Sequence, residues 1–330
     1  MDKTFNAITV EEKKSGQFFQ SIQERNIYHL PKGDLLVRVK YSSLNYKDSL
    51  SYFGNKGVTK IYPHTPGIDA MGIVEFSKTK DFNEGDKVIV TGYDLGMNTP
   101  GGFGEYIRVP KEWVTLLPDN LGDSESMILG TAGITAGLCV NAIQEKHKIK
   151  GKKAVVTGST GGVGCIAVML LTKLGAEVTA ITGKTSSQDF LFSIGAKEVL
   201  PRNDYLSSVK KPMSKGSWDI AIDVAGGEML AGLIASIKYG GIITCCGLVD
   251  SPSFTSSVFP FILRGINLIG IDSAENPINK KAEIWNNFAN HWKLDVIQNI
   301  SKNVDMYGMM DEINTILEGR QIGRVVLKHK

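Results

Sequence analysis

The chain has 330 residues, enough for one large or two ordinary domains, and its 42% hydrophobic and 22% charged residues are typical of a globular protein with a sizeable core. Its 37 basic and 34 acidic residues leave a net charge of +3, which argues against nucleic acid or an anionic membrane as a partner. No apolar run of about 18 residues suggests a transmembrane helix, and the first residues lack the layout of a secretory signal, so we expect a cytoplasmic protein.

Short predicted strands fill the first part of the chain. They lie at 35–39, 72–76, 87–90 and 106–109, and Gly-rich turn segments separate them. Regular short strands joined in this way indicate a barrel-like β domain.

The pattern changes near residue 122. Helices are predicted at 124–129 and 133–144, and from residue 153 strands alternate with helices. The predicted strands lie at 154–157, 177–181, 198–200, 219–224, 241–245 and 265–271, and the helices between them at 163–174, 190–194 and 228–237. These strands lack period-2 alternation, which is typical of a parallel sheet covered on both faces. Six of them match a doubly wound dinucleotide-binding domain of the α/β class.

The alternation of strands and helices ends after residue 271. The C-terminal part has predicted helices at 280–292 and 309–317 and a final predicted strand at 323–327. We expect this strand to rejoin the first domain. The chain is therefore predicted to hold a β-rich catalytic domain over 1–122, completed by 274–330, and a dinucleotide-binding domain over 123–273.

A glycine-rich loop, Thr-Gly-Ser-Thr-Gly-Gly-Val-Gly at 157–164, follows a predicted strand and opens a predicted helix. Glycines let the backbone approach a pyrophosphate, and the helix N-terminus supplies free N–H groups and the positive end of a dipole. The loop predicts a cofactor contact at Ser159, Thr160, Gly161, Gly162 and Val163.

The loop departs from strict G-x-G-x-x-G, since Ser159 stands where the first glycine would be. It also fits T-G-x-x-x-G-x-G, the loop of short-chain dehydrogenases. That resemblance demands a Y-x-x-x-K pair downstream, whereas the two matches here, at 28–32 and 52–56, lie upstream in the β-rich part. The short-chain interpretation is therefore weak.

The second predicted strand ends at Thr182, Gly183 and Lys184, about 20 residues beyond the loop, where NAD binders carry an acidic residue. Here Lys184 stands instead, and Arg202 follows the third strand as a second cation. A 2′-phosphate needs such charge-assisted donors, while a bare ribose does not. The sequence therefore predicts NADPH as the cofactor, the alternative being that both cations are solvated surface charges.

The four cysteines, Cys139, Cys165, Cys245 and Cys246, form no C-x-x-C pair, which gives a structural zinc site no support. We interpret them as small buried hydrophobic residues in a reducing compartment.

The order of these domains resembles the medium-chain dehydrogenase/reductase superfamily over essentially the whole chain. The stretches that carry the resemblance are 43–48, 66–72, 85–88, 130–133, 157–164 and 323–326. It implies a doubly wound (Rossmann) cofactor domain and a β-rich GroES-like barrel catalytic domain.

Zinc-dependent members of this superfamily carry G-H-E-x-x-G where this chain has Gly67-Ile68-Asp69-Ala70-Met71-Gly72. A catalytic zinc needs three protein ligands and an open position. Asp69 alone does not supply them, and His64, interpreted as a loop residue, has no cysteine near it in the sequence. No metal is therefore expected, and the zinc-free quinone oxidoreductases and enoyl reductases are the better match.

Within that branch the stretches 45–48, 157–164 and 261–264 resemble the acryloyl-CoA reductase subgroup. The resemblance implies hydride transfer from NADPH to a short 2-enoyl thioester, with charge developing on the carbonyl oxygen. Asn45 and Tyr46 are the candidate hydrogen-bond donors to that oxygen, and Tyr46 or water would supply the later proton. The alternative is that Asn45 only holds a turn and Tyr46 only packs.

The resemblance also places Arg324 near the cleft, where it would bind a substrate phosphate or carboxylate, the alternative being an ordinary ion pair. Thr131 is expected near the cofactor or as a helix cap. Leu248, Ile262 and Ser273 are expected to line the nicotinamide side.

Two further functions remain open. The acceptor could be a quinone or a free enone instead of a thioester, and the protein could be a non-catalytic NADPH-binding structural or sensor protein. The resemblance also implies that the predicted strand 265–271 forms an edge that pairs across a two-fold axis, as in relatives, so a homodimer is expected.

Overall fold

The computed structural model describes residues 3–330, which divide into two compact units. The first unit runs to Thr131 and resumes over Ser273–Lys330, and the second comprises Ala132–Asp272. The chain leaves the first unit inside helix α2 (Asp123–Gln144), later than the change of sequence pattern near residue 122 indicates. It returns at Ser273, one of the residues expected beside the cofactor.

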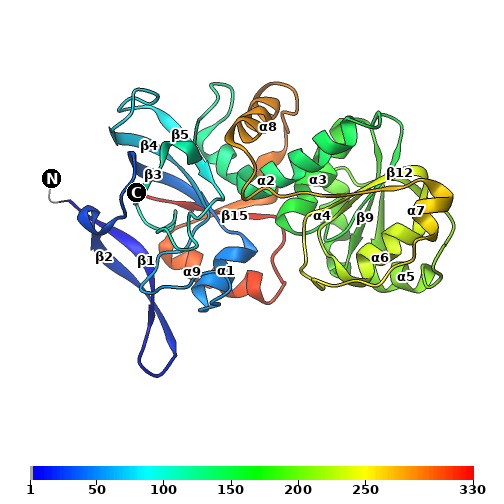
Figure 1. Cartoon of the computed structure of the whole chain (residues 1–330), viewed down its shortest axis with the longest axis horizontal. Helices are drawn as coiled ribbons and strands as arrows, with labels where there is room; N and C mark the ends of the chain where they lie inside the picture. The colour runs from blue at the N-terminus through cyan, green and yellow to red at the C-terminus, as the bar shows by residue number, and fades with distance from the viewer. Residues whose placement is uncertain (1–2) are drawn as a thin grey trace. The chain divides into compact units, whose positions relative to one another are not determined.

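Antiparallel strands form most of the first unit. Its larger sheet has the order β14-β15-β3-β4-β5-β7, with β6 paired to β3, while β1 and β2 form a separate antiparallel ribbon, blue in Figure 1. The pairing of β15 with β3 confirms that the C-terminal strand rejoins this part of the chain. The strands are β1 (Thr4–Glu12), β2 (Phe18–Asn26), β3 (Leu35–Ser43), β4 (Asp69–Ser77), β5 (Lys87–Thr91), β6 (Tyr106–Val109), β7 (Val114–Leu116), β14 (Ser301–Val304) and β15 (Arg324–Lys328).

The helices of the first unit are α1 (Tyr46–Tyr52), α8 (Ile278–Asn290) and α9 (Met306–Leu317). On α8 the buried residues Ile284, Trp285 and Phe288 share one face, as the amphipathic pattern of the sequence predicts. The α9 helix begins where the side chain of Asp305 accepts a hydrogen bond from the Gly308 amide at 2.9 Å.

The second unit holds a parallel sheet of the order β10-β9-β8-β11-β12-β13. Numbered along the chain, this is the 3-2-1-4-5-6 order of a doubly wound dinucleotide-binding fold, and the predicted fold class is confirmed. The strands are β8 (Lys153–Val156), β9 (Glu177–Thr182), β10 (Glu198–Pro201), β11 (Trp218–Asp223), β12 (Ile237–Cys245) and β13 (Asn267–Gly270). The helices are α3 (Gly162–Lys173), α4 (Gln188–Ser193), α5 (Arg202–Ser208), α6 (Gly227–Ser236) and α7 (Phe259–Arg264), green to yellow in Figure 1.

Helix α2 combines the two helices predicted at 124–129 and 133–144. It is continuous across a kink at Gly130, whose φ of 51° and ψ of −151° are not helical. Among residues 3–330 it is the one helix long and apolar enough, by length and composition, to cross a membrane, which the sequence analysis did not anticipate. Because 78% of that apolar window is buried inside the protein, α2 has the character of a core helix.

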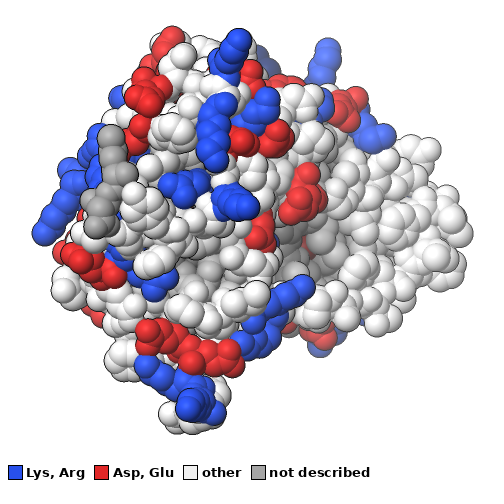
Figure 2. Space-filling model, turned by 60° about the vertical axis from the view of Figure 1, so that its left-hand side comes forward, with Lys and Arg blue, Asp and Glu red and all other residues white. Residues whose placement is uncertain are grey.

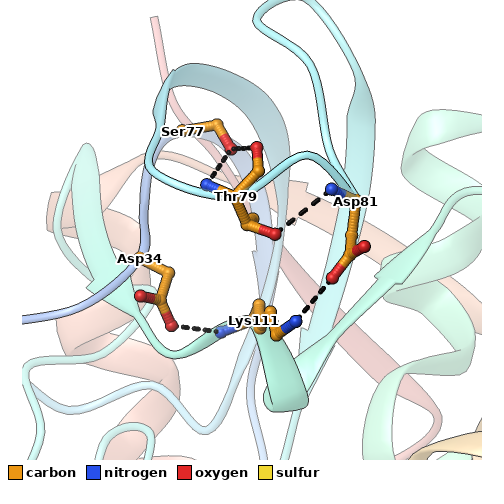
Figure 3. Close-up of polar contacts among 5 residues, drawn as sticks. All are labelled: Asp34, Ser77, Thr79, Asp81 and Lys111. Atoms are coloured by element: carbon orange, nitrogen blue, oxygen red, sulfur yellow. Dashed lines mark hydrogen bonds and ion pairs between the residues drawn. The ribbon is translucent and has the colours of Figure 1, made fainter.

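Surface turns of the first unit are fixed by local polar contacts. In Figure 3 the Lys111 ammonium lies 2.6 Å from the carboxylate of Asp81, and the Lys111 amide donates to Asp34 at 3.2 Å. Ser77 and Thr79 close the turn that follows β4. In Figure 2 charged side chains of both signs are interspersed over the left and centre of the view, whereas the right part carries few of them.

The cysteines are free thiols. Cys139 and Cys165 are buried, whereas Cys245 and Cys246, at the end of β12, are only partly covered. Burial raises the pKa of Cys245 to about 11, which keeps this thiol protonated and unreactive at neutral pH.

Candidate active site and cofactor loop

A buried carboxylate, that of Asp69 at the start of β4, organises the candidate site of the first unit. Its Oδ2 atom accepts hydrogen bonds from Ser43 Oγ at 2.6 Å, Asn45 Nδ2 at 2.8 Å and the Thr131 amide at 2.9 Å. Its Oδ1 atom accepts from Thr131 Oγ1 at 2.5 Å. Two of the predicted site residues, Asn45 and Thr131, are therefore brought together by a residue that the sequence analysis treated only as an inadequate zinc ligand.

Asn45 directly precedes α1, and its side-chain amide forms hydrogen bonds within this cluster. Besides the bond to Asp69, its Nδ2 atom donates to the Ser43 carbonyl at 3.3 Å, and its Oδ1 accepts from Arg324 at 3.3 Å. Both amide hydrogens thus have acceptors within the unit. This arrangement differs from the expected role of Asn45 as a donor to a substrate carbonyl and gives it the task of fixing the start of α1.

Arg324 begins β15 and is 3% exposed. Its Nε donates to the Ile128 carbonyl at 2.8 Å, and its Nη1 donates to the Leu44 carbonyl at 3.0 Å. The guanidinium therefore ties α2 and the segment before α1 to the C-terminal strand. The family resemblance implied a group that binds a substrate phosphate or carboxylate, or else an ordinary ion pair, whereas Arg324 is buried and donates to backbone carbonyls.

A second buried carboxylate, Asp48, lies in the first turn of α1. It accepts from the amides of Ile68 and Asn45, each at 2.8 Å. Burial, and after it the negative charge of Asp69, raise the pKa of Asp48 to about 7. Asp69 has the larger set of hydrogen-bond donors around it, four against two backbone amides at Asp48.

Gly130 places the Thr131 donors against Asp69. Its φ of 51° is a left-handed value, and a Cβ atom there would lie 2.5 Å from both Asp69 Oδ2 and Ser43 Oγ. Only glycine therefore allows the helix to kink at position 130 with the Asp69 carboxylate packed so closely against it. The stretch 130–133, used above for the family resemblance, was the sequence signal for this contact.

Tyr46, the first residue of α1, is 38% exposed and is the predicted catalytic side chain that remains open on this unit. The donor set around it does not suit a zinc ion, because the oxygens of Asp48 and Asp69 already accept hydrogen bonds and Ile68 offers no ligand atom. Among residues 3–330 no three His, Cys, Asp or Glu side chains gather in a metal-binding arrangement. His64 lies buried in a loop, where its Nε2 is 2.9 Å from the Gly96 carbonyl.

The glycine-rich loop of the second unit joins β8 to α3, as predicted. Ser159 is turned inward and donates from Oγ to the Val156 carbonyl at 2.7 Å. A Cβ on Gly164 would lie 2.2 Å from the Gly158 carbonyl oxygen, so the loop closes tightly on itself. At Gly161, which directly precedes α3, a Cβ would meet only the Gly158 oxygen at 3.3 Å. Gly162 and Val163 then begin the helix half-exposed.

Two cations converge on the turn after β9. The Lys184 ammonium donates to Thr160 Oγ1 at 3.3 Å, and the Lys184 amide donates to Thr182 Oγ1 at 2.9 Å. Arg202 follows β10, and a Cβ on Gly183 would lie 3.4 Å from its guanidinium carbon. Burial lowers the pKa of Lys184, so an anion placed here would favour the charged form. A loop that leaves space at Gly161 and two cations beside it fit a dinucleotide with a third phosphate.

The residues expected on the nicotinamide side differ in their place in the fold. Leu248 follows the end of β12 and is 61% exposed, and Ile262 on α7 is 70% exposed. Ser273 is the first residue of the first unit after the chain returns from the second.

Family models match both parts of the chain. An alcohol dehydrogenase GroES-like domain matches residues 31–119, and a zinc-binding dehydrogenase domain matches residues 162–290.

Individual relatives match nearly the full length. The chain is 39% identical to YhfP of Bacillus subtilis, named as a quinone oxidoreductase, over 99% of this chain and 100% of the relative. It is 36% identical to the acrylyl-CoA reductase AcuI of Ruegeria pomeroyi over 98% of each chain.

Crystal structures agree with this relationship. YhfP with NAD bound matches with a TM-score of 0.95 and 38% identity, over 99% of this chain and 100% of that one. The YhdH oxidoreductase of Salmonella enterica in complex with NADP matches with a TM-score of 0.94 and 36% identity, over 98% and 100%. With such identity over its whole length, the chain belongs to the medium-chain dehydrogenase/reductase superfamily, in the zinc-independent branch of the quinone oxidoreductases and acrylyl-CoA reductases.

Proposed function

We propose that this protein is an NADPH-dependent, zinc-independent reductase that transfers hydride to the activated C=C bond of a short 2-enoyl-CoA of the acryloyl-CoA type. The observation that carries the proposal is the pair of cations, Lys184 and Arg202, beside a glycine loop that leaves room for a pyrophosphate. The relative named acrylyl-CoA reductase supports the thioester as acceptor, and the NADP-bound relative supports the cofactor.

When bound, NADPH supplies the hydride. In the proposed site the loop residues Ser159 to Val163 receive the pyrophosphate, and Thr182 and Gly183 lie by the ribose. Lys184 and Arg202 bind the 2′-phosphate.

On the first unit, Tyr46 is the proposed donor to the carbonyl oxygen of the acceptor, since it is the exposed hydroxyl next to Asn45. Asn45, Thr131 and Arg324 act as positioning residues that fix the start of α1 and the kink in α2. Leu248, Ile262 and Ser273 are proposed to line the nicotinamide side. The proton for the α-carbon comes from Tyr46 or from water.

The acceptor is tested by comparing kcat/KM for acryloyl-CoA with that for a naphthoquinone, with NADPH as reductant. We expect the thioester to be preferred by at least about tenfold. Preference for the quinone by orders of magnitude would instead support the second candidate function, quinone reduction, which the relative YhfP favours. Tight NADPH binding with no acceptor reduced would support a non-catalytic role.

The cofactor assignment is tested with the double variant Lys184→Ala, Arg202→Ala. We expect the Kd of NADPH to rise about 100-fold, because two charge-assisted contacts are lost, and the Kd of NADH to change little. The matched control is Lys210→Ala, Lys211→Ala, since both lysines follow α5 and line a surface hollow that includes neither the glycine-rich loop nor the turn after β9. Equal losses for the two cofactors would remove the assignment.

The loop itself is tested with Gly161→Val. Gly161 has a φ of −79°, which valine can adopt, and a Cβ atom there would meet only the Gly158 carbonyl oxygen, at 3.3 Å. We therefore expect Gly161→Val to require a small shift of the loop and to retain the fold, which circular dichroism checks, while its side chain blocks the pyrophosphate. Unchanged NADPH affinity would contradict the role of the loop.

We further propose a cytoplasmic homodimer whose partners are its cofactor and small-molecule acceptors. The balanced net charge and the mixed charges in Figure 2 favour neither nucleic acid nor a membrane surface as a partner.

A further inference from the structure

A lysine of the first unit is buried. Lys281 on α8 is 1% exposed, although its neighbour Lys280 lies on the surface. Its ammonium donates to the carbonyls of Thr91 and Ala274, each at 2.8 Å, and lies 3.5 Å from the ring centroid of Tyr93. Two carbonyls and an aromatic face offset the cost of removing this polar group from water.

The packing of α8 does not require this charge. Trp285 and Phe288, 1% and 2% exposed, already anchor the same helix in the core. A methionine at position 281 would fill the space of a lysine at no desolvation cost. The amino group of Lys281 therefore acts as a link between the carbonyls of Thr91 and Ala274, to which it donates.

The backbone opposite Lys281 is strained. Tyr93, with φ of 53°, is the one non-glycine residue among 3–330 with a positive φ, and Gly92 before it has φ of 71°. Such strain persists where the surroundings enforce it, and it concentrates at functional positions. Here it directs the Tyr93 amide to the Ala274 carbonyl at 3.1 Å and its hydroxyl to the Asn276 carbonyl at 3.0 Å.

These contacts meet on one segment. Ala274 to Asn276 receives bonds from the end of β5 through Tyr93 and from α8 through Lys281. The segment directly follows Ser273, where the chain re-enters the first unit. We infer that Lys281 and Tyr93 are positioning residues that hold the returning chain so that Ser273 presents its backbone to the nicotinamide, an inference that rests on the proposed function.

The test uses Lys281→Met in the full-length protein, with Lys280→Met as the matched control on the same helix. In the cofactor-free protein we expect amide exchange in a peptide spanning 272–280 to accelerate at least tenfold in Lys281→Met only. We expect the single-turnover rate of hydride transfer to fall at least tenfold, because the nicotinamide is less well placed, while the Kd of NADPH rises less than threefold.

A purely structural role is tested with Phe288→Leu, which weakens the packing of α8 without touching the three contacts of Lys281. The inference is overturned if Phe288→Leu, at an equal loss of Tm, slows hydride transfer as much as Lys281→Met. It is also overturned if exchange over 272–280 is unchanged in Lys281→Met.

Tyr93→Phe covers the case in which Lys281→Met does not fold, since it keeps the ring and removes only the hydroxyl bond to Asn276. We expect an intermediate effect on exchange and on hydride transfer, and no effect on either would overturn the inference. Failure of the wild-type protein to oxidise NADPH would count against the proposed function, whereas the exchange result would still decide the role of Lys281.

Discussion

Two buried carboxylates, Asp48 and Asp69, show how hydrogen-bond partners set the behaviour of single residues in this site. Asp69 accepts from two hydroxyls, an amide side chain and a backbone amide, whereas Asp48 accepts from two backbone amides. Each donor stabilises the charged form, and burial opposes it. At Asp48 burial prevails, and its pKa rises to about 7.

The first prediction is a pH dependence of stability due to Asp48. Its pKa of about 7 in the folded protein lies above the ordinary value of 3.8 for an aspartate, so between these values the folded state binds more protons than the unfolded state. Stability due to this group therefore falls as pH rises from about 4 to 7, by up to about 4 kcal/mol. Asp48→Asn removes this pH-dependent contribution to stability. The Tm of the variant minus that of the wild type should therefore increase as pH rises from about 4 to 7.

Thermal unfolding at closely spaced pH values measures this difference. Asp81→Asn is the control, because the hydrogen bond from Lys111 lowers the pKa of Asp81. The contribution of Asp81 is lost only as pH falls through that lowered pKa, so the control difference should be flat between pH 5 and 7. A flat difference for Asp48→Asn as well would contradict the prediction.

The second prediction concerns Asp69→Asn. This change keeps the shape of the side chain but places an NH2 group, itself a donor, against the hydrogen-bond donors that surround Asp69. The free energy of unfolding should fall by about 2–4 kcal/mol, because a buried charged acceptor is lost and donors are left unpaired. Urea unfolding measures the change. Asp123→Asn, which removes an exposed ion pair with Lys87, should cost less than about 1 kcal/mol, and similar losses for both variants would argue against a central role for Asp69.

Single residues of this site were predictable from the sequence, but their roles were not. Asn45, Thr131 and Arg324 were all named as candidates. Their partners lie far away in the chain: Thr131 is 62 residues from Asp69, and Arg324 is 279 residues from Asn45. Periodicity and turn chemistry report local structure only, so the closed cluster became visible only in the folded chain.

At the scale of elements, the six strands of the second unit and its helices α3, α4 and α6 follow from apolar runs and helical periodicity, and their predicted positions agree with the structure to within a few residues. The ribbon of β1 and β2 was not predicted. The β2 strand, Phe-Phe-Gln-Ser-Ile-Gln-Glu-Arg-Asn, is mostly half-exposed and polar, so it carries no clear alternation. The α1, α5 and α7 helices have only six or seven residues, too few for a helical pattern to emerge.

The third prediction belongs to the kink in α2. Gly130→Ala should lower the free energy of unfolding by more than about 3 kcal/mol, because alanine there combines an unfavourable φ with a collision against Asp69 and Ser43. Gly151→Ala is the matched control, since Gly151 has φ of 77° but nothing within 4 Å of its Cβ position. The control should cost about 1 kcal/mol. Equal costs in denaturant unfolding would show that the close approach at Gly130 is unimportant.

At the scale of the whole molecule, the sheet of the second unit ends in β13, whose outer edge has no strand partner within the described chain. An exposed edge invites pairing with another strand. Apolar side chains lie nearby on the segment that leads into this strand, where Val258 is 68% and Leu263 is 56% exposed. The edge strand and the exposed side chains together favour a second copy of the chain as the partner.

The fourth prediction is therefore that the protein sediments with twice the mass of the 35.9 kDa chain and that Val258→Glu with Leu263→Glu reduces it to a monomer. Burying two carboxylates against their symmetry mates would cost several kcal/mol of association free energy. Leu116→Glu is the control, because Leu116 on β7 of the first unit is similarly exposed at 51%. Sedimentation equilibrium at micromolar concentration distinguishes the two masses, and a wild-type monomer, or a variant that stays dimeric, would exclude this edge as the interface.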